Sequence, residues 1–571
     1  MHRWIASTAL ALTALLSACG GGGGGSDGSA DTPLPMGGLV DATVYSSLPN
    51  AQLAGAEEAV AVTSHQLALG GRTLAYTATA GHLIARDPVA DSAQAKVFYV
   101  AYELDGIGPA ERATRPVTFF YNGGPGSASV WLHLGSFGPQ RLATGVPATT
   151  ASRPFPLVDN AETLLDVTDL VYVDAVGTSR SQAIAPYVNR DFWGVDADAA
   201  LFRDIVRRWL ARHGRTTSPF FLYGESYGGP RTAVLARRLQ EAGLWPAGLV
   251  LQSPALDYNS NCGVVSTPPI SCAGYLPSYA ATGAWHGLTQ PVPADSELDA
   301  WLADARQFAA TSWGPALDVH LAGGSADLSL TDPLAQLTGL PAIQWQGQYN
   351  LGPTRFRERL VSGQLLGRYD ARMLAPNGSA LAAEGDPSST WLTSSFQAAI
   401  QSHLHDTLGY RNTSTYVLLG QAIQYWDFSH DGRDLPDTVP DLAAALQADP
   451  ALRVLAVNGL HDLATPFHVT ETDLARLGSP RVTVRNYIGG HMSFLDDGTR
   501  PLQRADVVAF ITEALAAQPV RRAPLRASGP VAPAPPDRAG VPGVGSGPVV
   551  PEPAVQAPMR DPWVPPRQAP R

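Results

Sequence analysis

Residues 224–228 read Gly-Glu-Ser-Tyr-Gly and place a serine, Ser226, between two glycines. An apolar run typical of a strand, "PFFLYG", comes before this serine, and a helix-forming run, "PRTAVLARRLQ", follows it closely. A tight turn from strand to helix exposes the serine hydroxyl near the positive end of the helix. The pattern therefore predicts that Ser226 is a nucleophile, with an ordinary structural turn as the alternative.

A nucleophilic serine needs a base, and the base needs an acid that orients it. Where the serine lies at such a turn, the order along the chain is serine, acid, histidine. The strand-like run "RVLAVNG" is followed by Asp462, and the next such run, "RVTVRNYIGG", is followed by His491. We therefore predict Asp462 as the acid and His491 as the base. His461 is the rival base, and Asp257, after "GLVLQSPAL", is the rival acid.

An oxyanion that forms at Ser226 needs hydrogen-bond donors from the backbone. One donor is expected to be the N–H of Tyr227, the residue after the nucleophile, and the other an N–H from an earlier loop. The loop that begins at Asn122, "NGGPG", follows a strand-like run, and its glycines allow backbone amides to approach a ligand closely. Taken alone, the same loop could be an Asn-Gly hairpin turn.

The runs that carry these residues alternate with helix-like segments. The strand-like runs are short, rich in β-branched and aromatic residues, and end near Gly, Asn or Asp, as buried strands do. Segments such as "DADAALFRDIVRRWLARHG" and "RADVVAFITEALAAQ" have helical periodicity. The alternation predicts an α/β fold around a largely parallel sheet. From about residue 258 to 448 the pattern is interrupted by Trp, Pro, Gly and short helices, which we interpret as a mostly helical insertion over the sheet.

Four motifs in this order, "NGGPGS", "GESYGG", "HDLATP" and "GGHM", resemble the serine carboxypeptidase family in its bacterial branch, which has the α/β-hydrolase fold. The run "DLVYVDAVGTSRS" is also similar to a family motif, with Ala175 where proline is usual. The resemblance extends from about residue 75 to 514. It implies an enzyme that hydrolyses the C-terminal residue from peptides through an acyl-enzyme.

The resemblance also implies a role for each site residue. Ser226, His491 and Asp462 would form the catalytic triad. The N–H groups of Gly124 and Tyr227 would form the oxyanion hole. The C-terminal carboxylate of the peptide would be bound by Asn122, Gly123 and Glu225.

A carboxyl group beside an anionic substrate must share or hold a proton, and for this reason the family favours acidic pH. Better-known members pair this glutamate with a second one, but here Ser136 takes the place of the second glutamate, and Ser127 replaces a loop cysteine. We therefore expect weaker carboxylate recognition or a less acidic pH optimum. The alternative for Glu225 is a surface carboxylate stabilised by the helix N-terminus.

Other functions on the same fold stay open at this point. A general esterase or lipase would act on esters without a nearby carboxylate, and an acyltransferase would pass the acyl group to an alcohol. A third alternative is a tethered binding protein with an idle triad. The sequence suggests no metal or organic cofactor, and the oligomeric state and side-chain preference are not determined by it.

The two ends of the 571-residue chain differ from its middle. Residues 1–18 resemble a lipoprotein signal peptide, because the apolar run ends in Leu-Ser-Ala before Cys19. Lipidation of Cys19 would anchor the chain in the bacterial cell envelope, with the outer membrane expected because Gly20 is not aspartate. The alternative is an ordinary secretory signal. Residues 19–36 are expected to be a flexible tether, 37–518 the catalytic domain and 519–571 a disordered Pro/Ala-rich tail.

Export places the chain in an oxidising compartment, where Cys262 and Cys272 are expected to form a disulfide. Two buried free thiols are the alternative. A net charge of −11 argues against nucleic acid as a partner. The expected partners are therefore a peptide substrate and, through the lipid anchor, a membrane.

Overall fold

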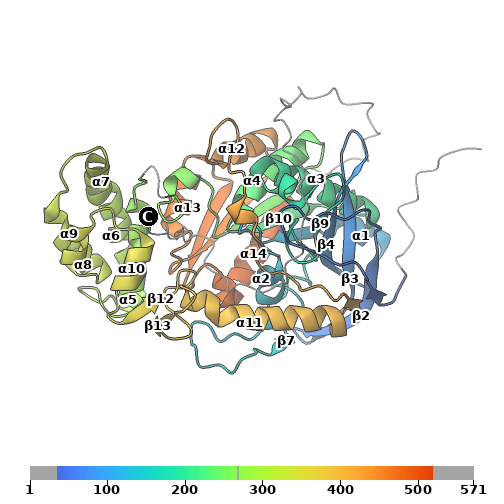
Figure 1. The fold of residues 1–571 in the computed structure, drawn as a ribbon, viewed down its shortest axis with the longest axis horizontal. Helices are drawn as coiled ribbons and strands as arrows, with labels where there is room; N and C mark the ends of the chain where they lie inside the picture. Colours follow the sequence, from blue (N-terminus) through green and yellow to red (C-terminus); the bar gives the residue numbers. More distant parts are fainter. Residues whose placement is uncertain (1–34, 266–268, 519–571) are drawn as a thin grey trace, which may run out of the picture.

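A ten-stranded sheet forms the centre of the computed structural model, which describes residues 35–265 and 269–518 (Figure 1). The strand order is β16-β15-β11-β10-β5-β8-β4-β3-β2, and the short strand β9 (Gln182–Ala183) pairs with β4. In that order the strands span Val482–Tyr487, Arg453–Gly459, Gly248–Gln252, Phe220–Glu225, Val117–Tyr121, Asp169–Val173, Ala93–Leu104, Arg72–Arg86 and Val60–Leu69.

The strands from β16 to β8 run parallel, and β8, β4, β3 and β2 pair antiparallel. Strands β5, β8, β10 and β11 are buried along their whole length, which agrees with their continuous apolar sequences. A largely parallel sheet of this strand order, with helices on both faces, is the α/β-hydrolase fold, so the prediction of fold class is confirmed. Because parallel strands end at one edge of the sheet, residues that follow β10, β15 and β16 are brought together there.

Helices cover both faces of the sheet, and consecutive strand residues belong to different cores. Phe119 packs with α3 (Val195–Arg212), α4 (Gly228–Glu241) and α12 (Val439–Ala448). Phe120 belongs to the core that includes α2 (Val130–Gly135), α11 (Pro387–Ser402) and α14 (Thr499–Ala517).

The segment between β11 and β15 contains the region expected to be a helical insertion. Figure 1 shows its first helices gathered beside the sheet, and they share a core that includes Trp313, Trp345 and Phe356. The later helices α11 and α12 pack against the sheet layers instead. The first helices are α5 (Leu276–Trp285), α6 (Leu298–Phe308), α7 (Gly314–Leu321), α8 (Thr331–Thr338), α9 (Ala342–Gly347) and α10 (Pro353–Arg359).

Near the start of this segment, Cys262 and Cys272 form a disulfide with their Cα atoms 5.3 Å apart. In residues 35–265 and 269–518, no helix combines the length and the apolar character needed to cross a membrane. The expected signal peptide, the lipidation site Cys19, nearly all of the tether and the tail at 519–571 lie outside the described residues.

Candidate active site

Ser226 lies at the turn between strand β10 and helix α4, in a strained backbone conformation. Its φ is +61°, a left-handed value that is uncommon for a residue with a side chain. The backbone N–H of Ser226 donates to the carbonyl oxygen of Gln252, 2.9 Å away. A Cβ at Gly224 would collide with the carbonyl oxygen of Gly228, so this close approach of strand and helix requires glycine. The half-buried serine is thereby held at the edge of the sheet.

Asp462 and His491, which follow β15 and β16, are in direct contact. Asp462 Oδ2 lies 2.7 Å from His491 Nδ1, and both side chains are buried. The other carboxylate oxygen, Oδ1, accepts hydrogen bonds from the N–H groups of Ala464, at 2.7 Å, and Thr465, at 3.1 Å. These donors fix the carboxylate, and the carboxylate in turn orients the imidazole.

The ionisation of His491 reflects this environment. Burial lowers its pKa, but the attraction and hydrogen bond of the Asp462 carboxylate and the charge of Glu225 more than compensate, so the pKa lies above its ordinary value. A partner that stabilises the imidazolium is what a general base beside a serine requires.

Sequence reasoning missed the residues that hold His491 in place. Thr465 Oγ1 lies 3.0 Å from His491 Nδ1 and 2.8 Å from Asp462 Oδ2, and it also lies 2.8 Å from the carbonyl oxygen of Ser253. Ser253 Oγ donates to the carbonyl oxygen of His491 at 2.8 Å, and the N–H of His491 donates to the carbonyl oxygen of Tyr369 at 2.5 Å. A hydroxyl three residues after the acid, in "HDLATP", was a signal that could have identified Thr465.

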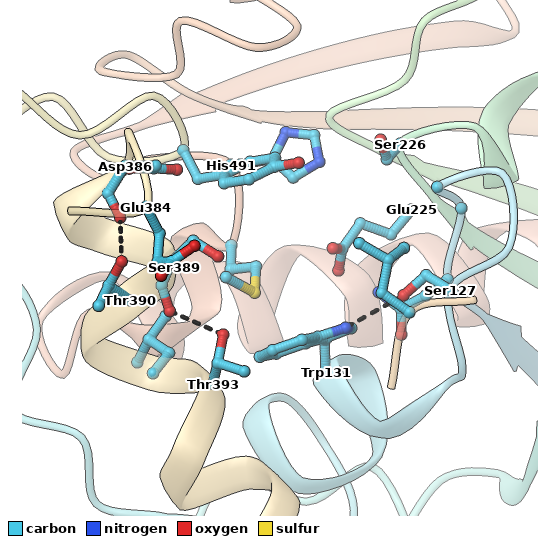
Figure 2. Close-up of a pocket in the computed structure, with 17 residues that line it drawn as sticks. Ser127, Trp131, Glu225, Ser226, Glu384, Asp386, Ser389, Thr390, Thr393 and His491 are labelled. Carbon is cyan, nitrogen blue, oxygen red and sulfur yellow. Dashed lines mark hydrogen bonds between the residues drawn. The ribbon is translucent and has the colours of Figure 1, made fainter. Parts of the chain in front are cut away.

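Ser226 and His491 open into one pocket, which Figure 2 shows. No hydrogen bond joins the serine hydroxyl to the imidazole within the part of the chain that the structure describes; such bonds often tighten only when substrate binds. The pocket is also lined by Asn122, Gly123, Gly124, Glu225, Trp131, Tyr369 and Met492, and by residues at and before the start of α11.

Glu225 is the last residue of β10 and is buried, with 3% of its surface exposed. Burial raises its pKa to about 8; Asp462 also raises it, whereas His491 and a hydrogen bond with the Asn122 side chain lower it. Its Oε2 has no hydrogen-bond partner among the described residues. The side chain is therefore a neutral carboxylic acid at pH 7 and not the surface carboxylate of the alternative interpretation.

Ser136 does not line the pocket around Glu225. It is fully buried at the end of α2, where its hydroxyl donates to the carbonyl oxygen of Leu132 at 2.5 Å. Desolvation therefore raises the pKa of Glu225 without a second glutamate at this position.

The glycine loop lies directly against the turn that carries Ser226. A Cβ at Gly123 would collide with the backbone nitrogen of Tyr227, so this nitrogen lies directly against the loop. Gly124 has a φ of +99°, which favours glycine. No backbone hydrogen bond is donated by the N–H of Gly124 or of Tyr227 to any residue within the described ranges. Both N–H groups are therefore available as donors near the nucleophile.

Asn122 is fixed from two sides. The buried guanidinium of Arg231 donates to its carbonyl oxygen at 2.6 Å, and Arg231 is held in turn by Asp198, 2.5 Å away. The side-chain oxygen Oδ1 of Asn122 accepts from the N–H of Leu132 at 3.1 Å. This bond assigns the amide so that its NH₂ group can donate toward Glu225 and the pocket.

The two rival residues lie elsewhere. His461 is buried against Trp285, with ring centroids 5.6 Å apart, and it does not line the pocket. Asp257 accepts from the N–H of Asn259 at 2.8 Å and forms an ion pair with Arg476 at 2.8 Å. Across the described residues, His, Cys, Asp and Glu side chains form no group of three or more that could hold a metal ion.

Part of the chain matches a known protein family. Residues 71–243 match the family model described as serine carboxypeptidase. This match includes the loop at Asn122 and the turn at Ser226. No curated protein sequence matches the chain.

Several solved structures are similar to the chain at low sequence identity. One is Kex1Δp, a prohormone-processing carboxypeptidase from Saccharomyces cerevisiae, with 14% identity, a TM-score of 0.48, and coverage of 76% of this chain and 91% of that chain. A proline iminopeptidase from Mycobacterium smegmatis has 16% identity, a TM-score of 0.32, and coverage of 80% and 100%. A thermophilic esterase from Thermogutta terrifontis has 14% identity, a TM-score of 0.31, and coverage of 76% and 98%. The family match shows that residues 71–243 of this chain are similar to the serine carboxypeptidase family.

Proposed function

We propose that this protein is a serine carboxypeptidase that releases the C-terminal residue of peptides through an acyl-enzyme. In the first step Ser226 Oγ attacks the carbonyl carbon of the last peptide bond, and His491 takes the hydroxyl proton. His491 then gives this proton to the departing amine, and the C–N bond breaks. Water, deprotonated by His491, hydrolyses the resulting ester. Asp462 keeps the imidazole oriented and stabilises its charged form, which the contact of 2.7 Å supports.

The tetrahedral intermediate of each step carries a negative oxygen. In this proposal the N–H groups of Gly124 and Tyr227 stabilise that oxygen, and the close packing of the glycine loop against the turn supports this assignment.

The raised pKa of Glu225 is the observation that favours a free C-terminal carboxylate as the group that the enzyme recognises. Glu225, adjacent to the nucleophile, is neutral at pH 7 because its pKa is raised to about 8. A neutral carboxyl group can donate a hydrogen bond to a carboxylate, whereas an ionised one would repel it. The Asn122 amide and the Gly123 N–H would supply further donors in the same pocket.

Carboxylate recognition is tested by removing these donors. N122A and E225A should raise KM for an N-blocked dipeptide with a free C-terminus by about 10- to 100-fold, because each variant loses a hydrogen bond to a charged group. Hydrolysis of p-nitrophenyl acetate, which has no carboxylate to bind, should change little. Equal losses on both substrates would argue against this role for Asn122 and Glu225.

An esterase, lipase or acyltransferase on the same fold is the alternative, and the replacement of the family's second glutamate by Ser136 is the feature that favours it. Under this alternative the triad would act on esters, and N122A would not discriminate between the two substrates.

We also propose that the chain is exported and lipid-anchored through Cys19, facing the periplasm or the exterior at the outer membrane. The support is the sequence at residues 1–36. Metabolic labelling with palmitate in a bacterial host should mark the full chain and not the C19S variant.

A further inference from the structure

A buried ion pair lies behind the glycine loop, on the side away from the pocket. Arg231, on helix α4, donates from Nε to Asp198 Oδ2 at 2.5 Å and from Nη2 to Asp198 Oδ1 at 3.2 Å. Asp198 belongs to helix α3, both residues are buried, and neither lines the pocket. A buried ion pair is seldom more stable than apolar side chains of similar size, so stability alone does not account for this one.

The remaining nitrogen of the guanidinium reaches the glycine loop. Nη1 of Arg231 donates to the carbonyl oxygen of Asn122 at 2.6 Å, and the two bonds to Asp198 fix the direction of this nitrogen. The peptide bond between Asn122 and Gly123 is trans, so the N–H of Gly123 points opposite to that carbonyl oxygen and away from Arg231. Gly123 lines the pocket, and its N–H donates to no backbone oxygen within the described ranges. The bond from Arg231 therefore determines where this N–H is aimed.

The next peptide of the loop is held by a different donor. The carbonyl oxygen of Gly123 accepts from the N–H of Ser127 at 3.0 Å. By the same geometry this bond sets the direction of the Gly124 N–H, which is the proposed oxyanion donor. The two N–H groups of the loop are thus oriented separately. Loss of Arg231 should disturb the Gly123 N–H, and carboxylate binding, more than it disturbs the oxyanion hole.

We propose that Arg231 is a positioning residue for the substrate carboxylate. It holds the peptide between Asn122 and Gly123 so that the Gly123 N–H faces the C-terminal carboxylate of the substrate, and Asp198 holds Arg231. A cationic donor on the carbonyl oxygen also polarises this peptide, which strengthens its N–H as a donor. The inference rests on the proposed carboxypeptidase function and adds to it the buried pair that prepares its carboxylate site.

The kinetic test uses the double variant D198N/R231M, which removes both charges so that neither is left buried without its partner. Its KM for an N-blocked dipeptide with a free C-terminus should rise by about 10- to 100-fold, while kcat on that peptide and hydrolysis of p-nitrophenyl acetate should change less than about 3-fold. R237M removes a half-buried arginine from the same helix, one that pairs with Asp441 and Glu241, and should behave as the wild type. Equal losses on the peptide and the ester would indicate a general structural role and overturn the proposal.

A spectroscopic test observes the Gly123 N–H without changing Arg231. The dipeptide Asn-Gly occurs three times in the sequence, with asparagine at 122, 377 and 458. Labelling asparagine carbonyls with ¹³C and glycine nitrogens with ¹⁵N therefore selects the amide signals of Gly123, Gly378 and Gly459 in a carbonyl-correlated NMR spectrum. The signal that is absent from N122Q belongs to Gly123. In S226A the free-acid dipeptide should move this amide proton downfield and the amidated dipeptide should not. A Gly123 signal that responds equally to both peptides, or to neither, overturns the proposal.

A binding measurement separates this inference from the proposed function. Calorimetry on S226A should show the free-acid dipeptide binding about 10-fold or more tightly than the amidated one, with the difference lost in S226A/D198N/R231M. If the wild type hydrolyses neither peptide but this difference and its loss are found, the carboxypeptidase function fails and the positioning role stands. A difference that survives D198N/R231M overturns the role and leaves the proposed function intact. Equal binding of the two peptides to S226A overturns both.

Discussion

The carboxyl group of Glu225 and the imidazole of His491 line the same pocket, and each changes the ionisation of the other. Burial raises the pKa of Glu225 to about 8, and the charge of His491 acts against this rise. Asp462 holds the pKa of His491 above its ordinary value, and the charge of Glu225 raises that pKa further once Glu225 is ionised. The protonation states needed for catalysis and for carboxylate binding are therefore linked through these two side chains.

This linkage predicts a pH window near neutrality for peptides with a free C-terminus. Glu225 can donate to a substrate carboxylate only below its pKa of about 8, and above that pH it ionises and repels the substrate. His491 must be neutral to accept a proton, so activity requires a pH above the raised pKa of His491. A pH profile of kcat/KM should therefore fall on the alkaline side near pH 8. An optimum at about pH 4 to 5, in the range of ordinary carboxyl groups, would contradict it.

The variant E225Q checks which group sets the alkaline limit. Glutamine has nearly the same shape and donates a hydrogen bond at every pH, so the alkaline fall in kcat/KM should be lost or shifted upward. The same profile measured with p-nitrophenyl acetate should show no Glu225-dependent fall in either protein. An unchanged alkaline limit in E225Q would assign it to another group.

Thr465 is predicted to act as a positioning residue. Its hydroxyl contacts Asp462, the Ser253 carbonyl oxygen and His491 within 3.0 Å, so T465V should loosen the orientation of the imidazole. We expect kcat to fall by about 10- to 100-fold with KM nearly unchanged, because a misplaced base slows chemistry more than binding. T465S keeps the hydroxyl and should recover most of the activity. A T465V variant with normal kcat, or a T465S variant as slow as T465V, would exclude this role.

The disulfide between Cys262 and Cys272 is predicted to stabilise the start of the helical segment. It closes a loop with a sequence separation of 10 residues, for which the loss of chain entropy corresponds to about 2 to 3 kcal/mol. C262S/C272S should lower the free energy of unfolding by about this amount in urea denaturation. Dithiothreitol should destabilise the wild type similarly and leave the double variant unchanged. Equal stability of the wild type and the double variant, with or without reductant, would contradict the prediction.

The sequence predicts the scaffold well because buried parallel strands leave a clear local signal. Strands β10 and β15 are buried apolar runs, and β16, at the end of the sheet, is a more exposed strand that begins with β-branched residues; the residues that follow these three strands must meet at one sheet edge. The contact between Asp462 and His491 follows from that topology. Asp257 also follows a strand, so the sequence cannot exclude it as the acid of the triad. The structure does so, because it places Asp257 in an ion pair with Arg476.

The wall of the pocket opposite Ser226 could not be predicted from the sequence in the same way. Glu384 and Asp386 lie in the helical segment, far along the chain from every recognised motif, and only the packing of α11 against the sheet layer brings them to the pocket. The burial of Glu225 is likewise a tertiary property. A carboxylate next to the nucleophile can be read from the sequence, but the pKa that determines its role depends on the atoms that cover it.

The most direct test of the carboxypeptidase function uses residues 35–518 of the wild type, with S226A as the control. Each protein is given two substrates, an N-blocked dipeptide with a free C-terminus and the same dipeptide with an amidated C-terminus. We choose a dipeptide that ends in lysine. The proposed function predicts that the wild type releases lysine from the free acid at least 100-fold faster than lysinamide from the amide, and that S226A releases neither. Equal turnover of the two peptides, or hydrolysis of simple esters alone, would contradict a carboxypeptidase and favour the esterase.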